Sequence, residues 1–229
     1  MPSDRWCGAN RRYGAGPRFV QTRRAALAGL AALLAARPAA AARALKLLCL
    51  GDSLTAGYLL PAGQGFAPVL ERELRKRGLA VEAIDAGVSG DTATAGAERL
   101  DWALGEGADV AVVELGANDM FRGTDPEITR RALDSILTRL KEKRVRPILA
   151  GMRASPGLGA DYVARFDRIY PELAEKHGVP LYPFFLEGVA GDRALNLPDG
   201  IHPTKAGVER IVAGILPLVE AELREAAAG

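Results

Sequence analysis

The chain has 229 residues, of which 48% are hydrophobic and 25% are charged, a composition typical of a globular protein. A chain of this length can bury a substantial core without disulfides or a structural metal. The formal net charge is +2, from 30 basic and 28 acidic residues. No long Lys or Arg run follows residue 42, so the sequence predicts no nucleic-acid partner.

The first 42 residues differ in kind from the rest. Paired arginines at 23–24 precede the apolar run AALAGLAALLAA (residues 25–36), and AAAA follows at residues 39–42. A basic segment, a short apolar run and small residues in this order predict an export signal over residues 1–42. The run is shorter than the roughly 20 residues that span a bilayer, so it predicts no transmembrane segment. The expected location is periplasmic or secreted.

The stretch TRRAAL (residues 22–27) also resembles a twin-arginine export signal. The general export route, a disordered Ala-rich extension and a translation start assigned too early are the alternatives. Seven Arg and one Asp lie in residues 1–42, which leaves 23 basic and 27 acidic residues after them. The predicted mature chain therefore carries a net charge of −4.

Cysteine and histidine are both scarce. Cys7 lies in the predicted signal and Cys49 lies within a predicted strand, where we expect a small buried hydrophobic side chain. A single remaining thiol allows neither an internal disulfide nor a cysteine metal cluster. With two histidines in the whole chain and no His-Glu-x-x-His motif, the sequence predicts no metal and no cofactor.

From residue 45 onward, short apolar runs alternate with helical patterns. Strands are predicted at residues 45–50, 79–85, 109–116, 145–152 and 179–185. Helices are predicted at residues 65–78, 92–107, 126–144, 161–178 and 203–226, the fourth with a kink or break at Pro171. This alternation predicts one domain over residues 43–229. Its expected fold is a three-layer α/β/α, flavodoxin-like, five-stranded parallel sheet of order 2-1-3-4-5.

In that order the loops after strands 1, 2 and 3 meet at one point of the carboxyl edge of the sheet, where ligands bind in such folds. The three loops are GDSLTAG (residues 51–57), AGVSGDT (residues 86–92) and GANDMFRG (residues 116–123). Each is rich in Gly and polar residues. Within the first loop, Asp52 is expected to be a turn or cap residue rather than a catalytic one.

A histidine and an aspartate stand together near the end of the chain, in LPDGIHPTKAG (residues 197–207). Pro203 starts the last helix and keeps His202 extended outside it, three residues after Asp199. Asp199 is therefore placed to orient His202, although a plain helix-entry turn is an alternative. The other histidine, His177, is expected to be an ordinary residue at a helix C-terminus.

Acyl transfer from a serine needs a base, a carboxylate that orients the base, and donors for the oxyanion. Ser53 stands at the tip of strand 1, and Asp199 and His202 complete a serine triad. The Ser53 N–H, the Gly90 N–H and the Asn118 side-chain amide are the expected oxyanion-hole donors. All are predicted to lie at the carboxyl edge of the sheet.

Four motifs then resemble the sequence blocks of the GDSL or SGNH hydrolases. They are GDSLTAGY (residues 51–58), GVSGDT (residues 87–92), GANDMFRG (residues 116–123) and DGIHPT (residues 199–204). The resemblance covers residues 45–220 and is closest to the secreted bacterial arylesterases and multifunctional acyl thioesterase/lysophospholipases. It implies the same triad and oxyanion hole. The Gly-x-Ser-x-Gly elbow of α/β-hydrolases is absent, because Thr55 replaces its second Gly.

The resemblance implies a serine esterase that forms an acyl-enzyme from a small-molecule ester or thioester, including aryl esters and lysophospholipids. Met120 and Phe121 are candidate apolar contacts for the acyl group, and Arg122 is a candidate anion contact; packing or solvated surface is the alternative for all three. Carbohydrate O-acetyl ester hydrolysis is the nearest alternative activity. A non-catalytic flavodoxin-like domain that binds a phosphate group such as that of FMN, or a catalytically silent relative, are alternatives of another class. A monomer is compatible with the sequence, which does not specify the oligomeric state.

Overall fold

The computed structural model describes residues 43–229 except Glu106, so the predicted export signal over residues 1–42 lies outside the described residues. The strands are β1 (Leu45–Gly51), β2 (Val81–Gly87), β3 (Val110–Glu114), β4 (Arg146–Ala150) and β5 (Leu181–Tyr182). They form a five-stranded sheet of order β2-β1-β3-β4-β5 in which each neighbouring pair is parallel. The predicted fold and strand order are confirmed.

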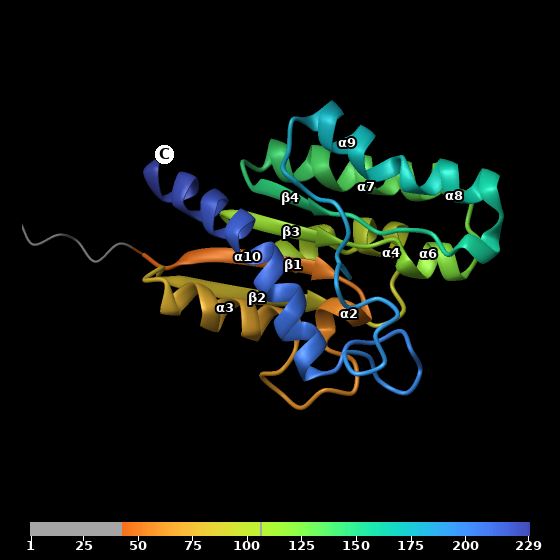
Figure 1. Ribbon diagram of the computed structural model, residues 1–229. Coiled ribbons are helices and arrows are strands. Elements are labelled where there is room, and N and C mark those ends of the chain that lie inside the picture. Colours follow the sequence, from red (N-terminus) through yellow and green to blue (C-terminus); the bar gives the residue numbers. More distant parts are fainter. Residues whose placement is uncertain (1–42, 106) are drawn as a thin grey trace, which may run out of the picture. The chain divides into compact units, whose positions relative to one another are not determined.

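Helices connect the strands and cover both faces of the sheet. They are α2 (Ser53–Ala56), α3 (Phe66–Lys76), α4 (Ala93–Glu98), α5 (Leu100–Leu104), α6 (Ala117–Phe121), α7 (Pro126–Glu142), α8 (Ala160–Asp167), α9 (Ile169–His177) and α10 (Lys205–Ala228), with a short 3₁₀ turn η1 (Pro156–Leu158) before α8. Helices α3 and α10 pack against each other on one face, and α4, α7 and α9 pack together on the other (Figure 1). The result is the expected three-layer arrangement.

Two of the predicted helices are each divided into two helices in the structure. The helix predicted at residues 92–107 is divided at Arg99 into α4 and α5. The helix predicted at residues 161–178 is divided at Arg168, three residues before Pro171, which therefore lies in the first turn of α9. Proline is tolerated there because the first N–H groups of a helix have no partner within it.

The fifth strand is shorter than the apolar run VPLYPFF predicts. Only Leu181 and Tyr182 pair with β4, because Pro180 and Pro183 on either side lack the N–H that a ladder requires. After Tyr182 the chain leaves the sheet, and Phe185 is buried against Phe66 of α3 with ring centroids 5.0 Å apart.

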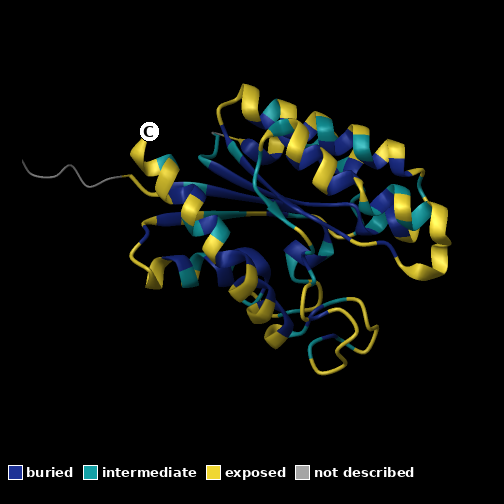
Figure 2. Ribbon diagram, turned by 45° about the horizontal axis from the view of Figure 1, so that its top comes forward, coloured by how far each residue is buried: buried dark blue, intermediate teal, exposed yellow. Residues whose placement is uncertain are grey.

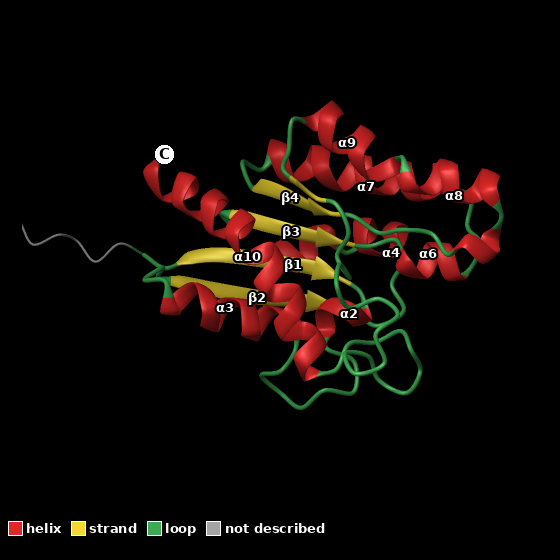
Figure 3. Ribbon diagram, viewed as in Figure 1, coloured by secondary structure: helices red, strands yellow, loops and turns green. Residues whose placement is uncertain are grey.

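The core consists of the strands and the inward faces of the helices (Figure 2). β3 is buried along its whole length, as expected for a central strand of a parallel sheet. Helix α7 presents Leu133, Ile136, Leu137 and Leu140 to this core at helical spacing. All arrowheads in Figure 3 point toward the same end of the molecule, so the loops that follow β1, β2 and β3 meet at one edge.

Candidate active site

Ser53 is the first residue of the short helix α2 and is separated from the end of β1 by Asp52 alone. Asp52 caps this helix, its Oδ1 accepting the Leu54 N–H at 2.9 Å. The turn is tight enough to require glycine at position 51, because a Cβ there would lie 2.0 Å from Oγ1 of Thr55. The GDS sequence therefore ends the strand abruptly and places the Ser53 hydroxyl at the edge of the sheet.

Ser53, His202 and Asp199 form a continuous hydrogen-bonded chain. The Nε2 atom of His202 lies 2.9 Å from Oγ of Ser53, and its Nδ1 lies 2.7 Å from Oδ2 of Asp199. His202 and Ser53 are 149 positions apart in the sequence. The structure thus brings together the three residues that the sequence singled out, in the order nucleophile, base, orienting carboxylate.

The loop around Asp199 holds its carboxylate in place. Its Oδ1 accepts the N–H groups of Ile201 at 2.9 Å and His202 at 3.0 Å. The pKa of Asp199 is lowered to about 2. The largest cause is the hydrogen bond from the His202 N–H, followed by those from the Ile201 N–H and the His202 side chain. Thr204 caps α10 by accepting the N–H of Gly207 at 3.3 Å. The helix therefore begins at Lys205 rather than at Pro203 as predicted, and His202 lies outside it as expected.

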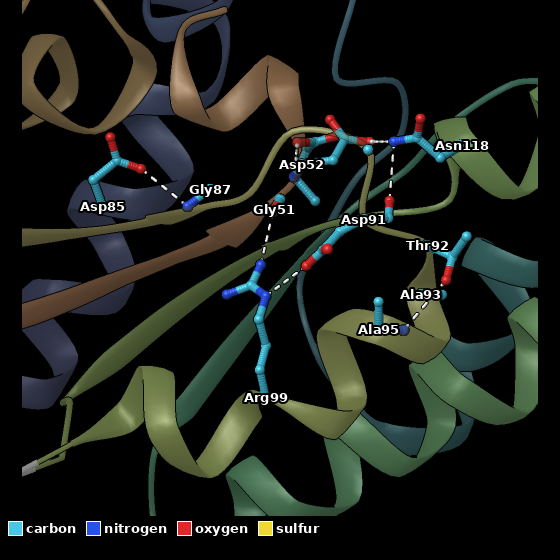
Figure 4. Close-up of polar contacts among 12 residues, drawn as sticks. Gly51, Asp52, Asp85, Gly87, Asp91, Thr92, Ala93, Ala95, Arg99 and Asn118 are labelled. Atoms are coloured by element: carbon cyan, nitrogen blue, oxygen red, sulfur yellow. Dashed lines mark hydrogen bonds and ion pairs between the residues drawn. The ribbon is translucent and has the colours of Figure 1, made fainter.

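Asn118 joins the loops that follow β1 and β2. It lies in α6, directly after β3, and its Nδ2 donates to Oδ2 of Asp52 at 3.0 Å and to the backbone O of Asp91 at 2.9 Å (Figure 4). Gly90 precedes Asp91 and has a φ of +88°, a conformation that favours glycine. The predicted oxyanion-hole residues therefore lie on three adjoining loops, but both N–H groups of the Asn118 amide already have protein acceptors.

Two acids are buried beneath this edge. Glu114 ends β3 fully buried, and its Oε2 accepts the Thr55 hydroxyl at 2.8 Å. Burial, and then the neighbouring Asp52, raise the pKa of Glu114 well above its ordinary value. Burial also raises the pKa of Asp52 to about 6. Asp52 is thus a cap residue, as expected, and also the acceptor that orients Asn118.

A cavity of about 800 Å³ opens beside Ser53 and His202. Its lining is mostly apolar and includes the large side chains Leu54, Met120, Phe121, Met152, Phe184, Leu186 and Ile201. Met120 is buried and Phe121 is 56% exposed. Arg122, the candidate anion contact, instead donates from Nη2 to the Gly90 carbonyl at 2.8 Å and lies outside this lining.

Two residues at the site were missed by reasoning from the sequence. The ring of Tyr58 lies against that of His202, with centroids 4.4 Å apart and planes at 37°. Its signal was its place at the end of GDSLTAGY. Arg99 contacts the loops after β1 and β2, and no spacing rule distinguishes it from the other arginines of the chain.

Within residues 43–105 and 107–229, no group of three or more His, Cys, Asp or Glu residues is arranged to hold a metal ion. Cys49 is a free, buried cysteine, and burial raises the pKa of its thiol. None of the helices described is long and apolar enough to cross a membrane.

Comparison with known proteins identifies the family. The model of the GDSL-like lipase/acylhydrolase family matches residues 49–210, which include all four motifs. The chain belongs to this family. Esterase TesA of Pseudomonas aeruginosa is 34% identical over 195 residues, covering 85% of this chain and 96% of TesA. The thioesterase 1/protease 1/lysophospholipase L1 of Escherichia coli is 38% identical over 166 residues, covering 72% of this chain and 78% of the relative.

Solved structures agree with this assignment. AlinE4, an SGNH-hydrolase family esterase, is 43% identical and superposes with a TM-score of 0.67, covering 79% of this chain and 97% of AlinE4. The resemblance to the GDSL or SGNH hydrolases is confirmed, and the chain is a GDSL-family esterase.

Proposed function

We propose that this GDSL esterase hydrolyses carboxylic esters through an acyl-enzyme on Ser53, with His202 as the base and Asp199 as its orienting partner. The observation that carries the proposal is the single imidazole hydrogen-bonded to Oγ of Ser53 on one nitrogen and to Asp199 on the other. Asp199, whose pKa is lowered to about 2, stays ionised at neutral pH and fixes the tautomer in which Nε2 accepts a proton.

The first step is attack on the ester carbonyl. His202 takes the proton from Ser53, Oγ forms a bond to the carbonyl carbon, and the carbonyl oxygen becomes an oxyanion. The Ser53 N–H, the Gly90 N–H and the Asn118 amide stabilise that charge. Because both N–H groups of Asn118 already donate to protein oxygens, the amide must exchange one of these acceptors for the oxyanion.

Collapse of this oxyanion completes the first step. The carbon–oxygen bond to the leaving group breaks, and His202 protonates that group. The second step releases the acid. A water molecule then gives its proton to His202 and attacks the acyl carbon, and the Ser53 oxygen leaves with the proton returned from His202. No metal or cofactor takes part in this sequence of steps.

The acyl group is proposed to occupy the 800 Å³ cavity, with Met120 and Phe121 as wall residues. A mostly apolar lining favours an acyl chain over a sugar ring, whose several hydroxyls would each need a hydrogen-bond partner. Aryl esters and medium-chain acyl esters or thioesters are the proposed substrates, supported by relatives that include an arylesterase of Vibrio mimicus, 38% identical over 159 residues, 69% of this chain and 80% of the relative.

Hydrolysis of p-nitrophenyl esters from two to twelve acyl carbons tests the proposal, with Ser53→Ala as the blank. We expect activity that falls to the blank level in the variant, and the chain-length optimum measures the depth of the acyl cavity. Trapping the acyl-enzyme by mass spectrometry at acidic pH should add the acyl mass to the peptide that contains Ser53. Unchanged turnover in Ser53→Ala would exclude Ser53 as the nucleophile.

We also propose that residues 1–42 are an export signal and that the mature enzyme is periplasmic or secreted. The charge and small-residue pattern of this segment supports the proposal. Mass spectrometry of the exported protein should give an N-terminus close to Arg43. Replacement of Arg23 and Arg24 by Lys tests the twin-arginine route, since only that route should be blocked. A full-length protein confined to the cytoplasm would contradict the proposal.

A further inference from the structure

Arg99, between α4 and α5, connects two of the loops that form the site. Its Nε donates to Oδ2 of Asp91 at 2.5 Å, and its Nη2 donates to the backbone O of Gly51 at 2.9 Å (Figure 4). The side chains of both Arg99 and Asp91 are largely buried, at 16% and 14% exposure. A largely buried ion pair is weakly screened by solvent, so its geometry is held more firmly than that of a surface pair.

Each end of this connection is next to a proposed oxyanion-hole donor. Gly51 is two residues before Ser53, and Asp91 directly follows Gly90. The backbone O of Asp91 also accepts the Asn118 amide at 2.9 Å. One guanidinium group is therefore linked to the segments that carry all three proposed donors.

The planar guanidinium group suits this task. Arginine presents its donors in a rigid fork, so the directions from Arg99 to Gly51 and to Asp91 are fixed relative to each other. A backbone contact from the Val88 N–H to the Gly51 carbonyl at 3.1 Å already joins the two loops. Arg99 adds a second connection closer to Gly90, and thereby limits how far Gly90 can move relative to Ser53.

We propose that Arg99 is a positioning residue of the oxyanion hole, which acts through its paired contacts with Asp91 and Gly51. This inference rests on the proposed function, because it assumes that Ser53, Gly90 and Asn118 stabilise an oxyanion. Donors must lie about 2.7–3.1 Å from the developing charge. A displacement of about 1 Å can lower the rate roughly 100-fold, so an arginine that never touches substrate can still control turnover.

The chain contains a matched control. Arg139 of α7 makes the same two kinds of contact, from Nη1 to the Ala97 carbonyl at 2.5 Å and from Nη2 to Oδ2 of Asp101 at 2.8 Å. Its partners belong to α4 and α5 and to none of the three loops. Arg139→Met therefore removes the same two kinds of contact without touching the three loops, although its partner Asp101 is 64% exposed and also pairs with Lys143. Because Ala97 and Asp101 lie two residues either side of Arg99, this variant measures what loosening the junction of α4 and α5 costs by itself.

The test compares Arg99→Met, Arg99→Lys and Arg139→Met by kcat, KM and Tm with p-nitrophenyl butyrate. We expect Arg99→Met to lower kcat roughly 10- to 100-fold with KM nearly unchanged, because the lost interaction acts in the transition state. Arg99→Lys should recover part of the loss, since one ammonium group replaces one of the two contacts. Arg139→Met should keep kcat within about threefold of wild type.

A double-variant cycle with Asn118→Ala separates positioning from general stability. Because residues that act as a unit in catalysis have non-additive effects, Arg99→Met should cost less in the Asn118→Ala background than in wild type if Arg99 acts through the oxyanion hole. Fully additive losses, or a kcat for Arg99→Met equal to that of Arg139→Met, would overturn the inference. Near-wild-type activity of Asn118→Ala alone would instead overturn the proposed oxyanion hole. If Arg99→Met does not fold, Arg99→Lys carries the same cycle.

Discussion

The described part of the chain contains two His–Asp pairs, which lie at opposite edges of the same sheet and have different environments. At the carboxyl edge, His202 contacts Asp199 at 2.7 Å. Near the amino edge, at the end of α9, Nε2 of His177 contacts Oδ1 of Asp134 at 2.5 Å. By distance alone, the second pair is as good a candidate for an acid–base site as the first.

The partners of each pair separate their roles. Asp134 also accepts two hydrogen bonds from Lys176 at 2.8 Å, and the His177 carbonyl accepts one from Lys141 at 2.6 Å. These contacts join α7 to the end of α9, and a cation at a helix C-terminus is favourable. Asp199 instead accepts hydrogen bonds from backbone N–H groups of its own loop. The second ring nitrogen of its partner His202 lies within hydrogen-bond distance of Oγ of Ser53.

The difference shows what converts a His–Asp pair into a catalytic unit. A nucleophile must be hydrogen-bonded to the second imidazole nitrogen, and hydrogen-bond donors for the developing negative charge must lie nearby. The carboxyl edge supplies both, because parallel strands β1, β2 and β3 deliver their following loops to one place. The cavity of about 640 Å³ beside His177 is lined by Lys141, Arg144, Arg146 and Glu222 among others, with no serine in its lining.

The sharpest test of this comparison replaces each histidine by glutamine. His202→Gln should lower kcat on the order of 10⁶-fold, the loss seen when a triad base is removed. His177→Gln should leave kcat within about twofold and slightly lower Tm. Both are measured with p-nitrophenyl butyrate and thermal unfolding. A large activity loss in His177→Gln would mean that the amino edge takes part in catalysis.

Replacing the two aspartates gives the next largest contrast. Asp199→Asn should lower kcat up to about 10⁴-fold, because an asparagine amide can favour the wrong tautomer of His202. Asp134→Asn should leave kcat unchanged and reduce the free energy of unfolding by about 1 kcal/mol, because Asp134 is partly exposed and pairs with the exposed Lys176 as well as with His177. Equal kcat values for the two variants would show that Asp199 only caps the helix-entry turn.

A smaller effect is expected at the cavity wall. Phe121→Ala removes an exposed apolar side chain, which should lower kcat/KM for octanoate esters roughly threefold to tenfold while acetate esters change little. Trp102→Ala is the control, since Trp102 of α5 is 79% exposed and lies outside the cavity lining. A uniform loss for all chain lengths would indicate that Phe121 does not contact the acyl chain.

Protonation of the buried Glu114 should affect the pH dependence of the free energy of unfolding rather than the activity. Because the pKa of Glu114 is raised well above its ordinary value, the folded protein keeps this proton while the unfolded chain loses it near pH 4.5. The free energy of unfolding should therefore fall as pH rises from about 4.5 toward the folded pKa. Asp52 contributes in the same direction only up to its pKa of about 6.

Urea unfolding of wild type and Glu114→Gln at pH values from 4.5 upward tests the Glu114 contribution. The variant should lose part of the fall in stability over this range, because glutamine has no proton to release. Glu82→Gln, at an exposed position near the start of β2, is the matched control for removing one carboxylate. Identical curves for wild type and Glu114→Gln would show that Glu114 is ionised in the folded protein.

Sequence patterns determined much of this protein. The alternation of apolar runs and helical periods indicates a parallel α/β sheet, and five strands fit the order 2-1-3-4-5, in which three loops meet. Local chemistry gives the Asp199–Gly200–Ile201–His202 turn, because Pro203 bars His202 from the helix. Spacing also shows that Ser53 and Asn118 follow strands 1 and 3. These features depend on residues that are close together in the sequence, or on apolar patterns that repeat along it.

Tertiary structure decided the rest. Whether Nε2 of His202 reaches Oγ of Ser53 depends on how α10 packs against α3, because that packing fixes where the loop before α10 lies. Tyr58 against His202, Arg99 between Gly51 and Asp91, and the occupied amide of Asn118 are contacts between distant segments. Hydrogen bonds and ring contacts form over 3–5 Å, and a sequence without the packed fold does not specify positions at that precision.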